Sequence, residues 1–368
     1  MIGSALDIFR LRQYFNVITR SREFADGIRE DVGLLDDLRK AVVTLPFERS
    51  HREPNPFPRF TPLTAGRVAN RRLALMATGG SGAMASVIGA ARALEEASVR
   101  PAVISLCSGS AMFGFPIAAG RSAEQVARFA LDLQPSDYID IGWRRLAAAV
   151  PTAGRGFAGL LDGDRIEAAY RRLLGDIRLG EMPIPAYAPI WNVEHNRLDY
   201  LGPRTFPDMP VARAIRMAVA LPLLIQPVEH VGQAWCDGGI VDIFPVHPVL
   251  DIEEPCDVAI AINGFYPPGF TGEDVSGWQN RSFSILYAAS QVRTCQQVEL
   301  ARANLARLRA TVDVAMIEPV PYEKVRGAGF YRQFLSSRDW PQFIRAGRTQ
   351  TREALAHLRS GRRRTNAA

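Results

Sequence analysis

Three short glycine-rich turns carry the residue types that acyl-transfer chemistry requires. They are residues 79–82 (Gly-Gly-Ser-Gly), 108–110 (Ser-Gly-Ser) and 237–239 (Asp-Gly-Gly). A serine hydroxyl becomes a nucleophile when a base takes its proton, and a carboxylate can be that base. Backbone N–H groups at a glycine-rich helix start can hold an oxyanion. If the three turns meet in space, they provide the parts of an acyl-transfer site.

Each turn follows an apolar segment that is predicted to be a buried strand, namely residues 72–78, 101–106 and 234–236. Helical patterns separate the strands, and this alternation predicts an α/β fold with a mainly parallel sheet between helices. Further strands are predicted at residues 184–193, 198–201, 257–263 and 313–318. We expect the strand before Asp237 to lie parallel and next to the strand before Ser110. Both turns would then share the carboxyl edge of the sheet, where open α/β sheets bind ligands.

Three regions are predicted along the chain. Residues 1–69 form a helical extension and a proline-rich linker, because apolar residues recur at helical spacing from Val32 to Leu45 and five prolines fall within residues 46–62. Residues 70–320 form the α/β domain. Residues 321–368 form a C-terminal helical extension with a basic tail. From residue 345 onward the tail contains seven arginines and only one acidic residue, Glu353. The arginines are Arg345, Arg348, Arg352, Arg359, Arg362, Arg363 and Arg364.

Composition excludes several classes of protein. The 47% of hydrophobic and 22% of charged residues are typical of a globular chain rather than a disordered one. No continuous apolar segment is long enough for a membrane span, and the first residues do not have the pattern of a signal peptide. The four cysteines and five histidines lack metal-ligand spacing. We therefore expect a cytoplasmic protein with reduced cysteines, without a metal or other cofactor, and without a nucleic acid partner.

In the order of its motifs, the chain resembles the patatin-like acyl hydrolases, over residues 71–264. The glycine-rich turn of that family matches residues 79–84, and its G-x-S-x-G motif matches residues 108–112 (Ser-Gly-Ser-Ala-Met). A small-residue helix leading to a proline turn matches residues 218–222. The family's Asp-Gly-Gly motif with a trailing proline matches residues 237–245, and the next strand, residues 257–263, also resembles the family's.

The resemblance implies a Ser–Asp dyad with Ser110 as the nucleophile and Asp237 as the general base. Gly109, Gly238 and Gly239 would shape the two motif turns. The resemblance places the oxyanion on the N–H groups of Gly80, Ser81 and Gly82, with help from Ala111. It implies hydrolysis of lipid acyl esters, such as phospholipids, through an acyl-enzyme and without a metal. The basic tail and the apolar face from Val32 to Leu45 would add peripheral contact with a membrane.

Two other functions fit the same residues. Methionines stand at positions 84 and 112, where the family has glycines, which favours a catalytically impaired domain with a binding or regulatory role. Residues 80–85 also fit the G-x-G-x-x-A pattern of dinucleotide-binding proteins, but the second strand does not end in the acidic residue which that pattern requires.

Two further sets of residues have both a functional and a purely structural interpretation. Tyr138, Trp143 and residues 154–163 could form a lid over an acyl pocket, or they could simply pack between helices. Cys107 and Cys236 precede the two dyad positions and could form a redox switch, although buried core cysteines are commoner.

Overall fold

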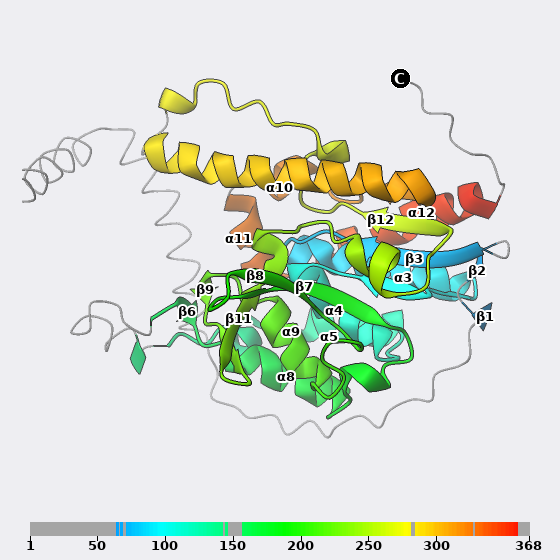
Figure 1. Cartoon of the computed structure of the whole chain (residues 1–368), viewed down its shortest axis with the longest axis horizontal. Coiled ribbons are helices and arrows are strands. Elements are labelled where there is room, and N and C mark those ends of the chain that lie inside the picture. Colours follow the sequence, from blue (N-terminus) through cyan, green and yellow to red (C-terminus); the bar gives the residue numbers. More distant parts are fainter. Residues whose placement is uncertain are drawn as a thin grey trace, which may run out of the picture. The chain divides into compact units, whose positions relative to one another are not determined.

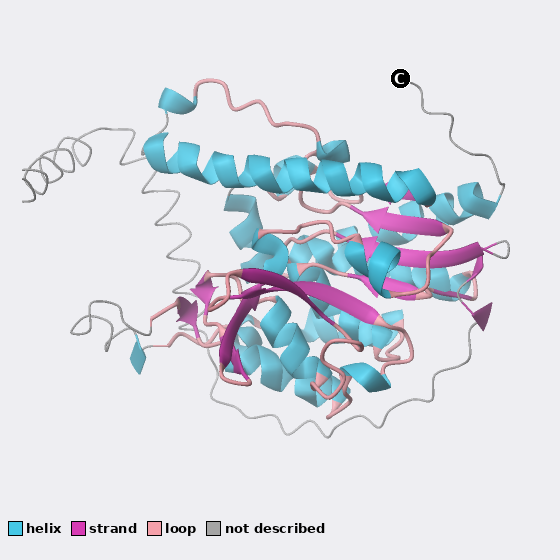
Figure 2. Ribbon diagram, in the orientation of Figure 1, coloured by secondary structure: helices cyan, strands magenta, loops and turns pink. Residues whose placement is uncertain are grey.

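A computed structural model describes residues 64–65, 67–68, 71–142, 144–145, 157–280, 284–326 and 328–359 (Figures 1 and 2). The apolar segment from Val32 to Leu45, Trp143 and the last three arginines of the tail lie outside the described residues. Residues 48–272 and 295–368 form one compact unit, which holds the sheet and the candidate site. Residues 273–294 belong to a second unit together with residues 1–47.

The centre of the first unit is a sheet whose five central strands are parallel, which confirms the predicted fold class. The strand order is β10 (Val228–His230), β11 (Gln233–Asp237), β7 (Ala186–Asn192), β5 (Val103–Ser105), β3 (Arg71–Ala77), β12 (Val258–Ile262) and β13 (Asp313–Ile317). The parallel strands are β7, β5, β3, β12 and β13. Strand β8 (Arg197–Leu201) pairs antiparallel with β7, and β2 (Arg67–Val68) pairs antiparallel with β3. Two short pairs lie outside this sheet, β1 (Thr64–Ala65) with β4 (Val99–Arg100) and β6 (Gly159–Leu161) with β9 (Leu223–Ile225).

Helices cover both faces of the sheet, and the alternation of side chains along the strands determines which residues meet which helices. Leu73 and Leu75 of β3 pack into one core, whereas Ala74 and Met76 pack into the other. The first core includes α3 (Ser86–Glu96), α4 (Ala111–Ala118), α5 (Ala123–Asp132), α8 (Asp164–Leu174), α9 (Val211–Ala218) and α12 (Trp340–Arg359). The second core includes the part of α10 (Ser284–Thr311) that begins at Val298.

Helix α12 packs directly on α3, because glycines let the two backbones approach. A Cβ atom on Gly89 would stand 1.9 Å from the carbonyl oxygen of Ile344, and one on Gly347 would stand 2.2 Å from that of Ser86. The C-terminal helix is therefore built into the same unit as the sheet.

Strand β11 differs from the expectation in its neighbour and in its direction. It pairs with β7 rather than with β5, and it runs antiparallel, with Asp237 opposite Ile190. Strand β7 continues past its last partner in β5, because Ser105 pairs with Tyr187 and β7 ends only at Asn192. Strand β11 lies along this projecting part of β7 and returns toward the centre of the sheet. Asp237 therefore reaches the end of β5 from the opposite direction to the one predicted.

Candidate active site

The turn after β5 places Ser108 in a conformation that non-glycine residues rarely adopt. Its φ angle is 50°, in the left-handed region. From Ser108 the chain enters a short 3₁₀ helix, Ser108–Ser110, and then α4. A serine on a sharp turn between a strand and a helix has the geometry of a nucleophile elbow. Residues in such strained conformations cluster at functional sites. They persist only where the surrounding structure compensates the free-energy cost of the conformation.

The expected pairing of Ser110 with Asp237 does not occur in the structure. The Ser110 hydroxyl donates a hydrogen bond to the carbonyl oxygen of Cys107 and accepts one from the Cys107 N–H, each 2.8 Å long. The Ser110 side chain is fully buried. The sharp turn begins directly after Cys107, which is the last residue in an extended conformation. The residue on the turn is therefore the next one along the chain, and Ser110 already lies inside the following helical turn. The turn residue is thus Ser108, two positions earlier than predicted.

Asp237 lies beside Ser108 at the end of β11. Its Oδ1 accepts a 2.8 Å hydrogen bond from the Gly239 N–H, whereas its Oδ2 is buried and has no hydrogen-bond partner among the described residues. Burial raises the pKa of Asp237 to about 7, although hydrogen bonding by the Ser108 side chain and by the Gly239 N–H acts to lower it. The Ser108 side chain is thus near enough to act on this pKa, although Oδ2 has no hydrogen bond of normal geometry. Unliganded catalytic pairs often have such geometry.

The turn at residues 79–82 packs against the Ser108 turn, and Gly109 makes this contact possible. A Cβ atom on Gly109 would stand 1.7 Å from the carbonyl oxygen of Gly80. Among the described residues, the N–H groups of Gly80, Ser81 and Gly82, the three predicted donors of the glycine-rich turn, have no hydrogen-bond acceptor. The structure thus brings together Ser108, Asp237 and a turn with unpaired N–H groups, the parts that an oxyanion hole requires.

The other predicted site residues have different positions. Ala111 cannot serve as an oxyanion donor, because its N–H is already bonded to the carbonyl oxygens of Ser108 and Gly109 inside the helical turn. Gly238 packs on the backbone of β7, where a Cβ atom would stand 2.5 Å from the Ile190 nitrogen. Gly239 lies between Ser108 and Asp237: a Cβ atom on it would stand 3.4 Å from Ser108 Cβ and 3.0 Å from Asp237 Oδ1.

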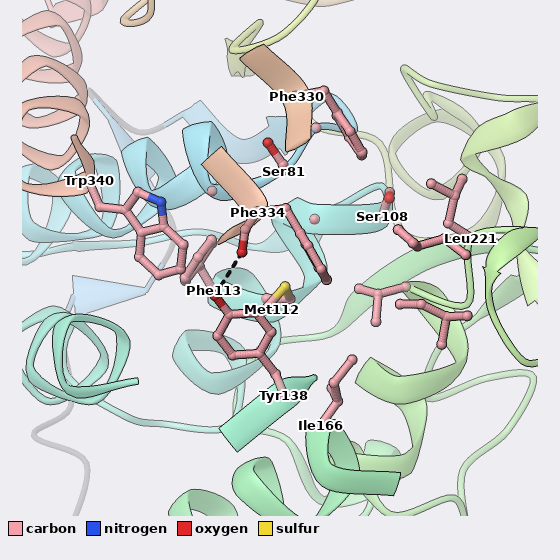
Figure 3. A pocket seen from close by; sticks show the side chains of 16 residues that line it. Ser81, Ser108, Met112, Phe113, Tyr138, Ile166, Leu221, Phe330, Phe334 and Trp340 are labelled. Carbon is pink, nitrogen blue, oxygen red and sulfur yellow. Dashed lines mark hydrogen bonds between the residues drawn. The ribbon is translucent and has the colours of Figure 1, made fainter. Parts of the chain in front are cut away.

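A largely apolar pocket opens beside Ser108 (Figure 3). Its volume, on the scale used for protein cavities, is about 40 Å³. The backbone of Gly80, Ser81, Gly82 and Gly109 lines one part of it. Apolar side chains line the rest; among those that Figure 3 labels are Met112, Phe113, Ile166, Phe330, Phe334 and Trp340. An apolar pocket with a few polar groups at the reacting end suits a ligand with a hydrocarbon portion.

The two methionines that favoured an impaired domain leave this arrangement intact. With Ser108 as the turn residue, the position two residues later is Ser110, whose small side chain fits the turn. Met112 lies two residues beyond it and lines the pocket. Met84 is fully buried beside Gly80, with its Cγ 3.1 Å from the place of a Cβ atom on that glycine.

A buried polar network supports the loop that follows Asp237. The Asp242 carboxylate accepts hydrogen bonds from the Tyr200 hydroxyl and the Asn304 amide, at 2.7 and 3.0 Å. The Cys107 thiol donates to the Asp242 carbonyl oxygen at 3.5 Å. Burial raises the pKa of the Cys107 thiol well above its usual range, so this cysteine is held in the unreactive thiol form.

Neither a metal centre nor a membrane span is found in the part of the chain that the structure describes. It contains no group of three or more histidine, cysteine or acidic side chains arranged to hold a metal ion. None of its helices combines the length and the hydropathy of a membrane span. The four cysteines are free thiols, and three of them are buried.

Sequence reasoning missed Ser108 as well as the aromatic residues Phe330, Phe334 and Trp340. Two features of the sequence could have identified Ser108 as the turn residue. It follows the apolar segment 101–106 after a single residue, and the two residues after it are small. Phe330 and Phe334 stand four residues apart, a helical spacing, but nothing in the sequence pattern shows which pocket they or Trp340 line.

Comparison with known proteins finds similarity to one family over just under half of the chain. Residues 75–250 match the family model of patatin-like phospholipases. An uncharacterized NTE family protein of Mycobacterium tuberculosis is 28% identical over 233 residues, which are 61% of this chain and 59% of that protein. Lysophospholipase NTE1 of Cryptococcus neoformans var. neoformans is 26% identical over 237 residues, 63% of this chain and 14% of its own length. The match therefore spans less than two thirds of either relative.

Two solved structures align with most of the chain at low identity. VipD from Legionella pneumophila aligns with 87% of this chain and 73% of its own, with a TM-score of 0.45 and 14% identity. Human GIVD cytosolic phospholipase A2 aligns with 92% of this chain and 64% of its own, with a TM-score of 0.44 and 11% identity.

Proposed function

We propose that this chain, whose residues 75–250 match the family model of patatin-like phospholipases, is a serine hydrolase of lipid acyl esters. In this proposal Ser108 is the nucleophile and Asp237 is the general base. The observation that carries it is the position of Ser108, which is held at a φ of 50° beside a buried carboxyl whose pKa is about 7. A base with a pKa near the working pH is well suited to take and return a proton.

The proposed reaction has two halves. In the first, Asp237 takes the proton of the Ser108 hydroxyl, and the serine oxygen forms a bond to the ester carbonyl carbon. The N–H groups of Gly80 and Ser81 stabilise the oxyanion. The C–O bond to the alcohol then breaks, and Asp237 returns the proton to the leaving oxygen. In the second half, water gives a proton to Asp237 and attacks the acyl-enzyme. The fatty acid leaves, and Ser108 regains its proton.

The substrate class follows from the pocket and the relatives. The largely apolar lining beside Ser108 supports an ester whose acyl part is a hydrocarbon chain. The name of the cryptococcal relative, a lysophospholipase, also supports a lipid ester. All proposed steps use groups of this chain.

The proposed compartment is the cytoplasm. The four cysteines are free thiols, which supports a reducing environment.

A fluorophosphonate probe tests the nucleophile. We expect one covalent adduct, located at Ser108 by peptide mass spectrometry, and no labelling or esterase activity in Ser108→Ala. The matched control is Ser110→Ala, which removes a hydroxyl two residues away. It loses the hydrogen bonds to Cys107, worth about 1 kcal/mol each, but it should still be labelled at Ser108. Labelling at Ser110, or equal labelling of Ser108→Ala, would overturn the proposal.

A further inference from the structure

One wall of the pocket comes from residues that lie beyond the family match. Helix α11 (Ala328–Leu335) contributes Phe330 and Phe334, and the start of α12 contributes Trp340. The indole of Trp340 lies against the oxyanion turn, since its Nε1 is 2.0 Å from the place of a Cβ atom on Gly82. This wall is thus particular to the C-terminal segment of this chain, and it contacts the reacting end of the pocket.

Helix α11 lies along the oxyanion turn. Its end is at Gly82, where a Cβ atom would stand 2.3 Å from the carbonyl oxygen of Gln333, and its start is near Gly80, the residue that contacts Gly109 beside Ser108. Figure 3 shows Phe330 and Phe334 in the pocket that this helix lines. Phe330 packs edge-on against Phe265, with ring centroids 5.4 Å apart. Phe265 Cβ lies 3.0 Å from the place of a Cβ atom on Gly80, so Phe330 is near the oxyanion turn. Phe334 is one helical turn further along, a distance of about 6 Å.

Phe334 contacts Tyr138, which belongs to another helix that lines the pocket. The rings of Phe334 and Tyr138 meet edge-on with centroids 5.5 Å apart. The Tyr138 hydroxyl, from α6 (Pro135–Tyr138), donates a 2.7 Å hydrogen bond to the Phe334 carbonyl oxygen. Tyr138 is only 5% exposed, and both side chains line the pocket. Because buried polar groups are costly to leave unpaired, this bond keeps the two walls together.

We propose that α11 selects the length of the acyl chain, an inference that rests on the serine hydrolase function proposed above. Phe330 contacts the first carbons after the ester carbonyl. Phe334, held by Tyr138, limits how far the chain can extend and therefore sets the longest acyl group that reacts well. Two phenylalanines on one helical face thus have different roles, because they stand at different distances from Ser108.

A series of straight-chain p-nitrophenyl esters, two carbons apart and used below their micelle concentrations, tests this inference. For the wild type, kcat/KM should rise with chain length to an optimum and then fall. In Phe334→Ala the optimum should move to longer chains, with a gain of about fourfold for each methylene newly accommodated, the equivalent of about 0.8 kcal/mol. Phe330→Ala, the matched control on the same helix, should lower kcat/KM for all lengths and leave the optimum in place.

A larger residue gives a second test that does not depend on the alanine variant folding. Phe334→Trp should move the optimum to shorter chains, with a melting temperature close to that of the wild type. An optimum that stays in place in both Phe334 variants, or that moves equally in Phe330→Ala, would overturn the inference alone. If no ester reacts and Ser108 is not labelled by a fluorophosphonate in the wild type, the proposed hydrolase function itself is wrong.

Discussion

At the scale of single residues, the buried carboxyl of Asp237 determines how the proposed reaction depends on pH. Burial raises its pKa to about 7, and the base works only when it is ionised. We expect kcat/KM to rise about tenfold per pH unit below that pKa and to level off above it. In Asp237→Asn this ionisation should disappear, and turnover should fall by about 10²–10⁴, the usual range for a general base.

The control variants for this pH profile are His230→Gln and His247→Gln. These histidines are the alternative bases that the sequence offers, and His247 is instead paired with Asp251 on the surface. Both variants should keep the rate and the ionisation of the wild type. A histidine variant that loses the ionisation, while Asp237→Asn keeps it, would move the role of base to that histidine.

The same carboxyl should lower the stability of the folded chain at high pH. Its pKa is about 7 when folded, against 3.8 for an ordinary aspartate, so between these values the folded state binds more protons. The contribution of Asp237 to stability therefore falls as pH rises through this window, by on the order of 4 kcal/mol in total. Asp237→Asn removes the effect. Its free energy of unfolding, measured by urea titration, should exceed that of the wild type increasingly from about pH 4 to about pH 8. A difference independent of pH would show that Asp237 is not a strained, buried acid.

At the scale of elements, the contact of α3 with α12 connects the fold to the site. Gly89→Ala would put a Cβ atom 1.9 Å from the Ile344 carbonyl oxygen, so α12 must move. Overpacking of this kind costs about 1–3 kcal/mol. We expect a clear drop in melting temperature together with a loss of esterase activity, because α12 also carries Trp340, which lies against Gly82.

The matched control on α3 is Arg92→Ala. Arg92 is exposed; it pairs with Glu96 on the same helix and, at 3.8 Å, with Glu124 of α5. Such pairs are worth about 0.3–0.5 kcal/mol, so melting temperature and activity should hardly change. If Gly89→Ala behaves like Arg92→Ala, the close contact between α3 and α12 does not matter for the site.

The elements that the sequence predicts best are those with a continuous apolar pattern. Strands β3, β12 and β13 lie within a few residues of their predicted bounds. The direction of β11 was not predictable, because five residues with no periodic signal fit either orientation. The sequence alone does not decide between Ser108 and Ser110 as the turn residue, because Gly109 has a serine on each side. Only the backbone angle at Ser108 and the hydrogen bonds of Ser110 to Cys107 distinguish them.

At the scale of the whole molecule, the excess of arginine at the C-terminus predicts peripheral contact with anionic lipid. Arg345 and Arg352 are exposed on α12, whereas Arg348 is partly used in an ion pair with Glu96. Each basic residue near a membrane surface contributes about 1 kcal/mol, an effect that fades with salt. We expect co-sedimentation with vesicles that contain phosphatidylserine, and not with purely zwitterionic vesicles.

A variant with Arg362, Arg363 and Arg364 changed to glutamine is the test of this electrostatic contact. It should bind anionic vesicles more weakly and keep its activity on a short p-nitrophenyl ester. Binding that depends neither on lipid charge nor on these arginines would contradict the prediction.

The position of β11 against β7 also determines when catalysis can first appear as the chain folds. Ser108 and Asp237 are far apart in sequence, and β7 is the strand that connects their neighbourhoods. Pairings between distant segments lose much chain entropy before they gain any contact, so they close late. The proposed hydrolytic activity therefore requires the pairing of β11 with β7, and its appearance during refolding reports that this pairing has formed.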